Sequence, residues 1–495
     1  MKRAQRVLLK DTIRSLDEYV SRRGGEGLNA ARKCDPEAVI AELEASGLRG
    51  RGGAGFPTGR KWRTMVENRS STLPTTVVIN GAEGEPGTFK DRSILRRNPY
   101  HVLEGALIAA HAVGADHIVF GLKRTFATEV ARVRAAMSEL QAAGWAEGIG
   151  LEVFEGPDEY LYGEETALLE AIDGRFPFPR IAPPFRRGVE PAALRHAGLA
   201  PRSGLPARVR MAGPTLDTDA PPALVDNVET LANIPRIIAR GAEWFRTVGT
   251  QQSPGTITCT VTGSTRRHGV AEVIMGTPLR DVIKGIGGGA RPGRRIKAVL
   301  PGVSSGIIPA ELLDAPVSYE GLADIGSGLG SASFIVFDDT VDLTAVAAGV
   351  SRFLGVESCG QCTPCKFGGL RLADELQDLI LSEADPEALT PIEVHAGTVN
   401  EQARCYLAHQ HRAVLQSLLT RYPEEFQGHV TGASPPVEPY LIAELVDIVD
   451  GVARWDERFR DKQPDWSHDP LTKGKVPADR FGQNRFGDWT FRPDL

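Results

Sequence analysis

Four of the six cysteines in this 495-residue chain have a spacing typical of metal ligands. Cys359, Cys362 and Cys365 follow one another at three-residue intervals, and Cys405 is the nearest thiol outside that loop. A tight turn with this spacing can place three thiolates round an iron-sulfur cube. Zinc also accepts thiolates, but usually as two separated pairs. The pattern therefore favours a 4Fe-4S cluster on these four residues, with zinc or unligated thiols as the alternatives.

The other two cysteines, Cys34 and Cys259, carry no such pattern. Cys259 alternates with threonines in residues 256–262, which is typical of a strand, and we expect both thiols in the core. Six cysteines are too few for a disulfide scaffold in a chain of this length. Their clustering favours metal ligation in a reducing cytosol.

A glycine-rich loop at residues 50–55 could bind a phosphate group. Its glycines are Gly50, Gly52, Gly53 and Gly55, and its basic neighbours are Arg49, Arg51, Arg60 and Lys61. The letters match the dinucleotide fingerprint, but that fingerprint needs a preceding strand, and here a helix is expected. Exposed backbone N–H groups beside positive charge suit a phosphate or a flavin cofactor. A flexible surface hairpin is the alternative.

Two acidic pairs follow expected strands. Glu83 and Glu85 come soon after the apolar residues 76–79, and Glu164 and Glu165 follow Gly163 in a similar position after residues 151–154. Open α/β sheets bind ligands at the carboxyl ends of their strands. Acidic residues there can also simply cap a helix. Two such pairs together with a glycine loop indicate a binding site.

An alternation of strands and helices begins near Thr75. We expect strands at 76–79, 117–122 and 151–154, with helices at 95–113 and 127–143. Such alternation predicts an α/β fold with a mostly parallel, Rossmann-like sheet. Later, residues 256–262 read as a strand and residues 279–283 as a helix, which suggests a small β-grasp-like unit. Beyond Asp338 the period becomes helical.

These patterns divide the chain into five parts. They are an N-terminal helical segment at 1–46, a Rossmann-like domain at 47–250, a β-grasp-like (SLBB) domain at 251–335, a helical bundle carrying the cysteines at 336–427, and a C-terminal extension at 428–495. In the extension we expect a helix over 440–459. The aromatic residues that follow, Trp466, Phe481, Phe486, Trp489 and Phe491, suggest a docking tail.

Charge and hydropathy exclude several classes of protein. The net charge is −6 and no long basic block occurs, so nucleic acid is a poor candidate partner. The most apolar stretch, residues 102–122, is interrupted by Glu104, His111 and Asp116, which argues against membrane insertion. No export signal is visible, and we expect a cytoplasmic protein.

Four motifs taken together carry a resemblance to a known family. They are residues 47–62, Glu83 to Gly87, Gly163 to Thr166, and Glu357 to Cys365. In order and spacing they resemble the flavin-bearing, 51 kDa-type subunit of respiratory complex I and its relatives in NAD-linked hydrogenases and formate dehydrogenases. The resemblance spans roughly residues 40 to 425. It implies the cofactors FMN, NAD(H) and a 4Fe-4S cluster.

The resemblance also implies roles for individual residues. Gly50, Gly52, Gly53 and Gly55 would line FMN with Lys61 and Asn80 nearby, Phe56 and Phe185 would stack on the dinucleotide, and Glu85 and Glu165 would hydrogen-bond it. Glu83, Gly163, Glu164 and Asn227 complete the cofactor-binding set, and no residue is expected to be catalytic in the acid–base sense. The chain departs from the family pattern at Ala82, Thr64 and Asp226, where an aspartate, an aromatic residue and an asparagine are usual.

We therefore expect an oxidoreductase subunit of the NADH dehydrogenase type. It would exchange electrons between NADH and FMN and pass them singly to the cluster. No cysteines remain for a second cluster, so the resemblance implies partners: a thioredoxin-like 2Fe-2S subunit and a catalytic subunit. The alternatives are the same fold serving another donor or acceptor, such as a ferredoxin, and a relay subunit that has lost FMN.

Overall fold

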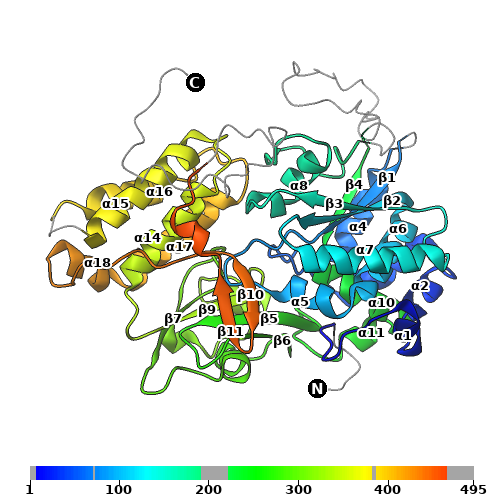
Figure 1. Cartoon of the computed structure of the whole chain (residues 1–495), viewed down its shortest axis with the longest axis horizontal. Coiled ribbons are helices and arrows are strands. Elements are labelled where there is room, and N and C mark those ends of the chain that lie inside the picture. Colours follow the sequence, from blue (N-terminus) through cyan, green and yellow to red (C-terminus); the bar gives the residue numbers. More distant parts are fainter. Residues whose placement is uncertain (1–6, 71–72, 191–194, 196–220, 382–385, 465–495) are drawn as a thin grey trace, which may run out of the picture.

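The computed structural model describes residues 7–70, 73–190, 195, 221–381 and 386–464. Figure 1 shows three bodies of structure: a helix-covered parallel sheet, a second sheet below the centre, and a group of helices on the opposite side. In the described part of the chain, no helix is both long enough and apolar enough to span a bilayer.

Four helices occupy the first part of the chain: α1 (Leu16–Ser21), α2 (Glu26–Ala31), α3 (Pro36–Ser46) and α4 (Thr58–Glu67). The boundaries of α3 follow from its sequence. Asp35 caps the N-terminus by accepting a hydrogen bond from the Glu37 N–H, and Pro36 fits the first turn. Gly47 ends the helix with a φ of 68°. The glycine loop thus follows a helix, as the sequence predicts.

The parallel sheet has the strand order β3-β2-β1-β4, and every neighbouring pair is parallel. Its strands are β1 (Thr75–Asn80), β2 (Ala115–Lys123), β3 (Gly150–Gly156) and β4 (Ala223–Asn227). The helices around it are α5 (Lys90–Arg97), α6 (Pro99–Val113), α7 (Ala127–Ala142), α8 (Glu165–Ile172), α10 (Val228–Arg240) and α11 (Ala242–Phe245). The Rossmann-like architecture predicted from the alternation is confirmed.

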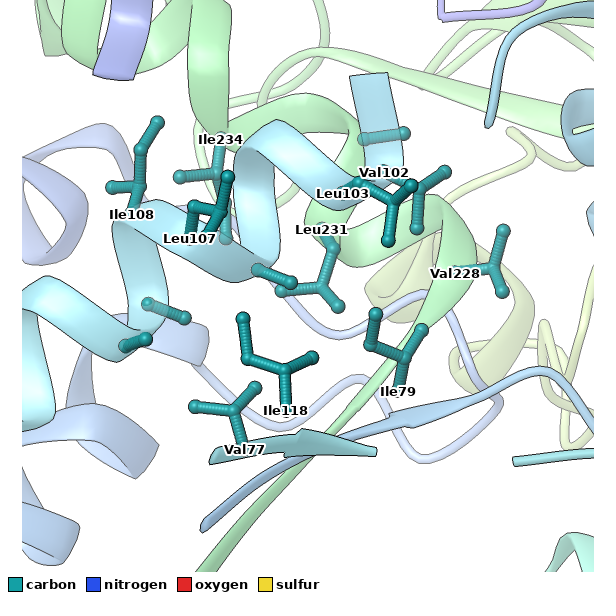
Figure 2. Close-up of a cluster of buried hydrophobic side chains, with 14 of the residues drawn as sticks. Val77, Ile79, Val102, Leu103, Leu107, Ile108, Ile118, Val228, Leu231 and Ile234 are labelled. Atoms are coloured by element: carbon teal, nitrogen blue, oxygen red, sulfur yellow. The ribbon is translucent and has the colours of Figure 1, made fainter. Parts of the chain in front are cut away.

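Alternate residues of the central strand enter different cores. Val77 and Ile79 of β1 pack with α6 and α10, as Figure 2 shows for the cluster around Leu107 and Leu231, whereas Val78 packs with α8. Both faces of the sheet are therefore covered, as parallel sheets require. A Cβ at Gly105 would lie 2.1 Å from the Leu231 carbonyl oxygen. This glycine lets α6 and α10 approach each other closely over the sheet.

The helix expected at 95–113 is two helices. α5 ends at Arg97 and α6 begins at Pro99, with Asn98 between them at ψ 77°. Proline disfavours the helical conformation of the residue before it, so the chain must turn at Asn98. This break separates α5 from α6, and the first turn of α5 contacts Asn227 at the end of β4.

The second sheet is mixed and has the order β6-β5-β9-β7-β8. Its elements are β5 (Thr256–Gly263), β6 (Gly269–Ile274), α12 (Leu279–Val282), η3 (Ile283–Gly287), β7 (Ile296–Leu300), β8 (Ile308–Pro309), η4 (Ala310–Leu312), α13 (Tyr319–Ala323) and β9 (Ser333–Asp338). The first strand pairs with the last in parallel, and a helix follows the first hairpin. This is a β-grasp arrangement, and it buries Cys259 completely, as predicted. Cys34, expected in the core, is instead exposed on the short segment between α2 and α3.

The helical bundle consists of α14 (Leu343–Val356), η5 (Pro364–Gly368), α15 (Gly369–Leu381), α16 (Leu389–Thr398), α17 (Leu407–Arg421) and α18 (Pro423–Val430). These helices enclose one apolar core. Cys359, Cys362 and Cys365 lie between α14 and α15, and Cys405 closely precedes α17.

The prediction of a helix over residues 440–459 is wrong. Residues 445–455 form a hairpin of β10 (Leu445–Val449) and β11 (Val452–Trp455), followed by η6 (Glu457–Arg460). Asp450 and Gly451 form its turn with φ values of 51° and 77°. Asp-Gly is the usual dipeptide for a two-residue hairpin turn with two positive φ angles. The proposed docking tail beyond residue 464 lies outside the described residues.

Candidate cofactor and cluster site

A cavity of about 720 Å³ lies where the three bodies of structure meet. Asn80 and Asn227, the last residues of β1 and β4, line it. These two strands are neighbours although β2 and β3 lie between them in the sequence, so the order of the sheet reverses there, which is where α/β sheets bind ligands. We call this part, together with the glycine loop, the glycine-loop end. The volume is within the range that holds cofactor-sized ligands.

The glycine loop is fixed in place by contacts beneath it. Its Gly50 N–H donates to the Phe56 carbonyl at 2.8 Å, and the Tyr319 hydroxyl donates to the Gly50 carbonyl at 2.5 Å. Gly55 has a φ of 63°, and a Cβ there would lie 2.4 Å from the Tyr319 ring. Only glycine fits that position without strain. The loop is thus a built wall of the cavity and not a free hairpin.

The basic residues of this loop have separate places. Arg51 is fully buried and donates to the carbonyls of Pro254 and Thr256, away from the cavity. Lys61 lines the cavity and pairs with Glu165 at 2.8 Å. Burial alone would lower the pKa of Lys61, but Glu165 and Asp226 together raise it. Lys61 therefore supplies the wall with a stable positive charge.

Asp226 faces this positive charge from β4. Its Oδ2 accepts a hydrogen bond from Trp62 Nε1 at 2.7 Å. Burial raises the pKa of Asp226 to about 6, although Lys61 and Trp62 both act to lower it. Asp226 is thus a costly buried carboxylate held by two neighbours.

Within each acidic pair, the two carboxylates do different things. Glu164 caps α8 by accepting hydrogen bonds from the backbone of Thr166 and Ala167. Glu83 accepts a hydrogen bond from the Asp91 N–H at 2.8 Å and pairs with Arg92, so it binds the first turn of α5. The first residue of each pair therefore stabilises a helix start, as the alternative interpretation expected.

All four carboxylates line the cavity, but the second residue of each pair bonds to other groups than a helix start. Glu165 meets Lys61, as described above, and Glu85 accepts hydrogen bonds from the Tyr160 hydroxyl at 2.6 Å and the Val303 N–H at 2.7 Å. Burial raises the pKa of Glu85 to about 7, and these hydrogen bonds limit the rise. Glu85 joins the Rossmann-like unit to the β-grasp unit through Val303.

Lys90, Asp91 and Glu229 form a buried charged group near the same wall, and the sequence analysis did not predict it. Lys90 is fully buried between Asp91 at 2.8 Å and Glu229 at 3.0 Å. Asn227 donates to Asp91 at 2.8 Å. Burial raises the pKa of Asp91 to about 6, while Lys90 opposes the rise. These residues come from α5, β4 and α10, so only the folded chain brings them together.

The four cysteines of the predicted cluster surround one small cavity together with Leu161, Ser358 and Gln361. Cys405, Leu161 and Leu407 also line the large cavity, and we call this wall together with the small cavity the thiol end. The two spaces are therefore separated by single side chains. Among the described residues, no three His, Cys, Asp or Glu side chains are grouped closely enough to hold a single metal ion as they stand.

Polar groups point at the sulfur atoms. The Arg404 N–H donates to Cys362 Sγ at 3.4 Å, Gln361 Nε2 donates to Cys359 Sγ at 3.5 Å, and Ser358 Oγ lies 3.2 Å from Cys365 Sγ. Such contacts suit negatively charged sulfur. Burial raises the pKa of Cys365 to about 11 and that of Cys405 to about 12. A cluster's iron would supply the positive charge that thiolates need in this setting.

The cavity collects nearly the whole predicted set. Its lining includes Gly50, Gly52, Gly53, Gly55, Phe56, Lys61, Asn80, Glu83, Glu85, Gly163, Glu164, Glu165 and Asn227. Phe185 is absent from the lining and packs against the core of the parallel sheet. Ala82 lines the cavity, whereas Thr64 does not. The residues missed include Tyr160, Tyr319 and the β-grasp loops at 304–305 and 328–331, whose only signal is their richness in glycine and serine.

Two family models match this chain. The Nuo51 FMN-binding domain matches residues 43–236, and the NADH-ubiquinone oxidoreductase-F iron-sulfur binding region matches residues 345–429. The first covers the glycine loop and the parallel sheet, and the second covers all four cysteines of the thiol end.

Individual relatives agree with these matches. The F subunit of NADH-quinone oxidoreductase in Streptomyces coelicolor is 35% identical over 87% of this chain and 91% of its own length. A second F-type chain of that enzyme, in Rhizobium meliloti, is 34% identical over 82% of this chain and 93% of its own. Among solved structures, the NAD+-reducing NiFe hydrogenase in its H2-reduced state has a TM-score of 0.70 and 29% identity, over 85% of this chain and 67% of the other.

Proposed function

This chain belongs to the family of NADH-quinone oxidoreductase F subunits, and from that premise we propose how its residues perform the family's electron transfer. The glycine-loop end of the cavity binds FMN and admits the nicotinamide dinucleotide beside it. Electrons leave through the thiol end to a 4Fe-4S cluster on Cys359, Cys362, Cys365 and Cys405. One observation carries the proposal: Cys405 lines both the large cavity and the thiol cavity.

The wall chemistry fits a flavin phosphate and sugar chain. Gly50, Gly52, Gly53 and Gly55 present backbone instead of side chains, and Gly52 is close to Asn227, where a Cβ would lie 3.2 Å from the asparagine Cβ. Lys61 adds positive charge, and Asn80 and Asn227 add amide groups. When bound, FMN accepts two electrons together and releases them one at a time.

The protein's own part is positioning. Phe56 is 49% exposed at the rim of the cavity, where an aromatic ring can stack on an entering nicotinamide dinucleotide. Glu85 and Glu165 offer carboxylate oxygens to its hydroxyl or amide groups. Glu83 and Glu164 act indirectly, because they fix the helix starts that shape the wall. Phe185 would need to move to take part in stacking.

The reaction requires no acid or base from the chain, because a hydride carries its own electron pair to the acceptor. Exclusion of water matters more, since the walls from three units enclose the reacting groups. The short separation between the large cavity and the sulfur atoms then allows electrons to pass without movement of the chain.

The small number of cysteines indicates that this chain needs partner subunits. After the four cluster cysteines, only Cys34 and Cys259 remain, and neither belongs to a ligand motif. The named relatives are subunits of larger enzymes. We propose that a thioredoxin-like 2Fe-2S subunit and a catalytic subunit accompany this chain in the cytoplasm and exchange its electrons.

An anaerobic titration of the purified complex tests the proposal. In the purified chain we expect one FMN and four iron atoms, and in the complex we expect bleaching of the flavin absorbance when NADH is added. Iron without FMN would indicate a relay subunit instead. FMN that remains oxidised with NADH but is bleached by reduced ferredoxin would indicate a different donor. Zinc without visible absorbance would contradict the cluster itself.

A further inference from the structure

The C-terminal segment after the bundle inserts charged side chains into the interior. Lys462 is 2% exposed and pairs with Glu357, which is 3% exposed. Glu357 stands two residues before the first thiol of the cluster loop, Cys359. A lysine and a glutamate are rarely buried this completely unless they are paired. Each of the two residues therefore depends on the other for its burial.

Glu357 also contacts the wall of the large cavity. Its Oε2 accepts a hydrogen bond from the Tyr160 N–H at 3.0 Å, and the Tyr160 hydroxyl in turn donates to Glu85. One carboxylate thus contacts the cavity wall through Tyr160 and stands two residues before the cluster loop in the sequence. Lys462 is the cation that balances it.

Aromatic packing holds Lys462 in this place. Its ammonium lies 4.4 Å from the centre of the Phe459 ring. Phe459 stacks on Phe353 of α14 with centroids 5.2 Å apart, and Phe353 meets the edge of Tyr160 at 5.4 Å. The segment is therefore clamped against the same residues that carry Glu357.

The surrounding charges make Lys462 the critical cation. Glu444 and Asp158 also attract it. Lys123 lies 2.5 Å from Glu444 and 3.9 Å from Asp158, and Arg458 reaches Asp158 at 3.3 Å. The ion pairs of the described residues give Glu357 no cation other than Lys462. Loss of the lysine would leave an uncompensated negative charge beside the cluster loop.

We propose that Lys462 is a positioning residue that raises the reduction potential of the 4Fe-4S cluster by neutralising Glu357. This inference rests on the proposed cluster function. Reduction adds one electron, and so one negative charge, to the cluster without breaking a bond. A neighbouring negative charge opposes that step in a poorly polarisable interior, and a neighbouring positive charge favours it. The Lys462–Glu357 pair keeps the two effects in balance.

Redox titration of the full complex, reduced with dithionite and followed by electron paramagnetic resonance, tests the proposal. We expect Lys462→Met to lower the midpoint potential of the cluster and Glu357→Gln to raise it. The double variant should return close to the wild-type potential, because both charges are gone. Lys462→Arg should also stay close to it.

A matched control is Lys297→Met, which removes the cation of the partly buried Lys297–Glu425 pair, away from the residues that line the thiol cavity. Its midpoint potential should not change. If Lys462 had only a structural role, the midpoint potentials of the two single variants would shift in the same direction or not at all. Either result would overturn the inference. If Lys462→Met loses iron, the absence of a rise in Glu357→Gln would overturn it equally. A purified wild-type chain without iron would instead overturn the proposed function.

Discussion

At the thiol end of the cavity, three of the four sulfur ligands come from seven consecutive residues, Cys359 to Cys365. At the glycine-loop end, Gly55 depends on Tyr319, Glu85 depends on Tyr160 and Val303, and Asn227 contacts Asp91. The thiol end is thus built mostly from local sequence, and the glycine-loop end from distant segments that fold against each other. Damage to the first should remove one ligand group completely, whereas damage to the second should weaken binding by degrees.

The largest expected effect is at Cys405, the one thiol that the local loop does not supply. Cys405→Ser should lose the cluster, because a hydroxyl replaces a thiolate ligand at the point shared by both cavities. In the purified chain, iron should fall well below four atoms while FMN stays near one, as measured by metal and flavin analysis. Cys34→Ser, which changes an exposed thiol, is the control. Equal iron contents in the two variants would refute the ligand assignment.

A graded effect is expected at the glycine-loop end. Gly55→Ala places a Cβ 2.4 Å from the Tyr319 ring on a residue with a φ of 63°. Strain of about 1–3 kcal/mol should weaken FMN binding about tenfold or more. Gly397→Ala is the control, since Gly397 lies outside the cavity lining and a Cβ there would meet no atom within 4 Å. Fluorescence titration of the apoprotein with FMN gives both affinities, and equal losses would argue against the close contact.

Asp226 offers a test in which the variant gains stability. The pKa of Asp226 in the folded protein is about 6, above the usual 3.8, so the charged carboxylate destabilises the fold. The penalty grows as pH rises through about 4 to 6 and is complete above that window. Asp226→Asn should therefore gain roughly 1–3 kcal/mol at pH 7.5.

Unfolding followed by denaturant at pH 7.5 and at pH 4 measures this difference. The gain from Asp226→Asn should nearly vanish at pH 4, where the wild-type carboxyl is mostly protonated in the fold. A gain that is equal at both values would mean that packing, and not charge, distinguishes the two side chains.

The smallest expected effect separates the two residues of one acidic pair. Glu164→Ala removes the cap of α8 and should cost about 1 kcal/mol of unfolding free energy with little change in the KM for NADH. Glu165→Ala should do the reverse, raising the KM with little change in stability. Steady-state kinetics and thermal unfolding of both variants decide this. An increase in KM that is greater for Glu164→Ala would assign direct binding to the cap instead.

The sequence predicts best what is encoded locally. Three of the four strands of the parallel sheet, the β-grasp strand over 256–262 and the cysteine loop all depend on short-range spacing, and each lies where it was expected. The fourth strand, β4 (Ala223–Asn227), was not predicted. Tyr160 and Tyr319 could not be assigned, because their roles arise only when the bundle and the β-grasp unit close over the sheet. The segment 445–455 was wrongly predicted as a helix, although the dipeptide Asp450-Gly451 is a sequence signal for a hairpin turn. Phe185 was assigned to the site from the family resemblance, but it packs against the core of the parallel sheet.

The pair between Glu357 and Lys462 also orders events during synthesis. A growing chain exposes Cys359, Cys362 and Cys365 well before Lys462 is made. Until then, the Glu357 carboxylate has no cation to pair with, so it stays in contact with water. We therefore expect the loop to reach its final surroundings only after Lys462 has paired with Glu357. Iron delivered to a nascent chain would meet three thiols on an open loop, and iron delivered to a finished chain would meet a completed chamber.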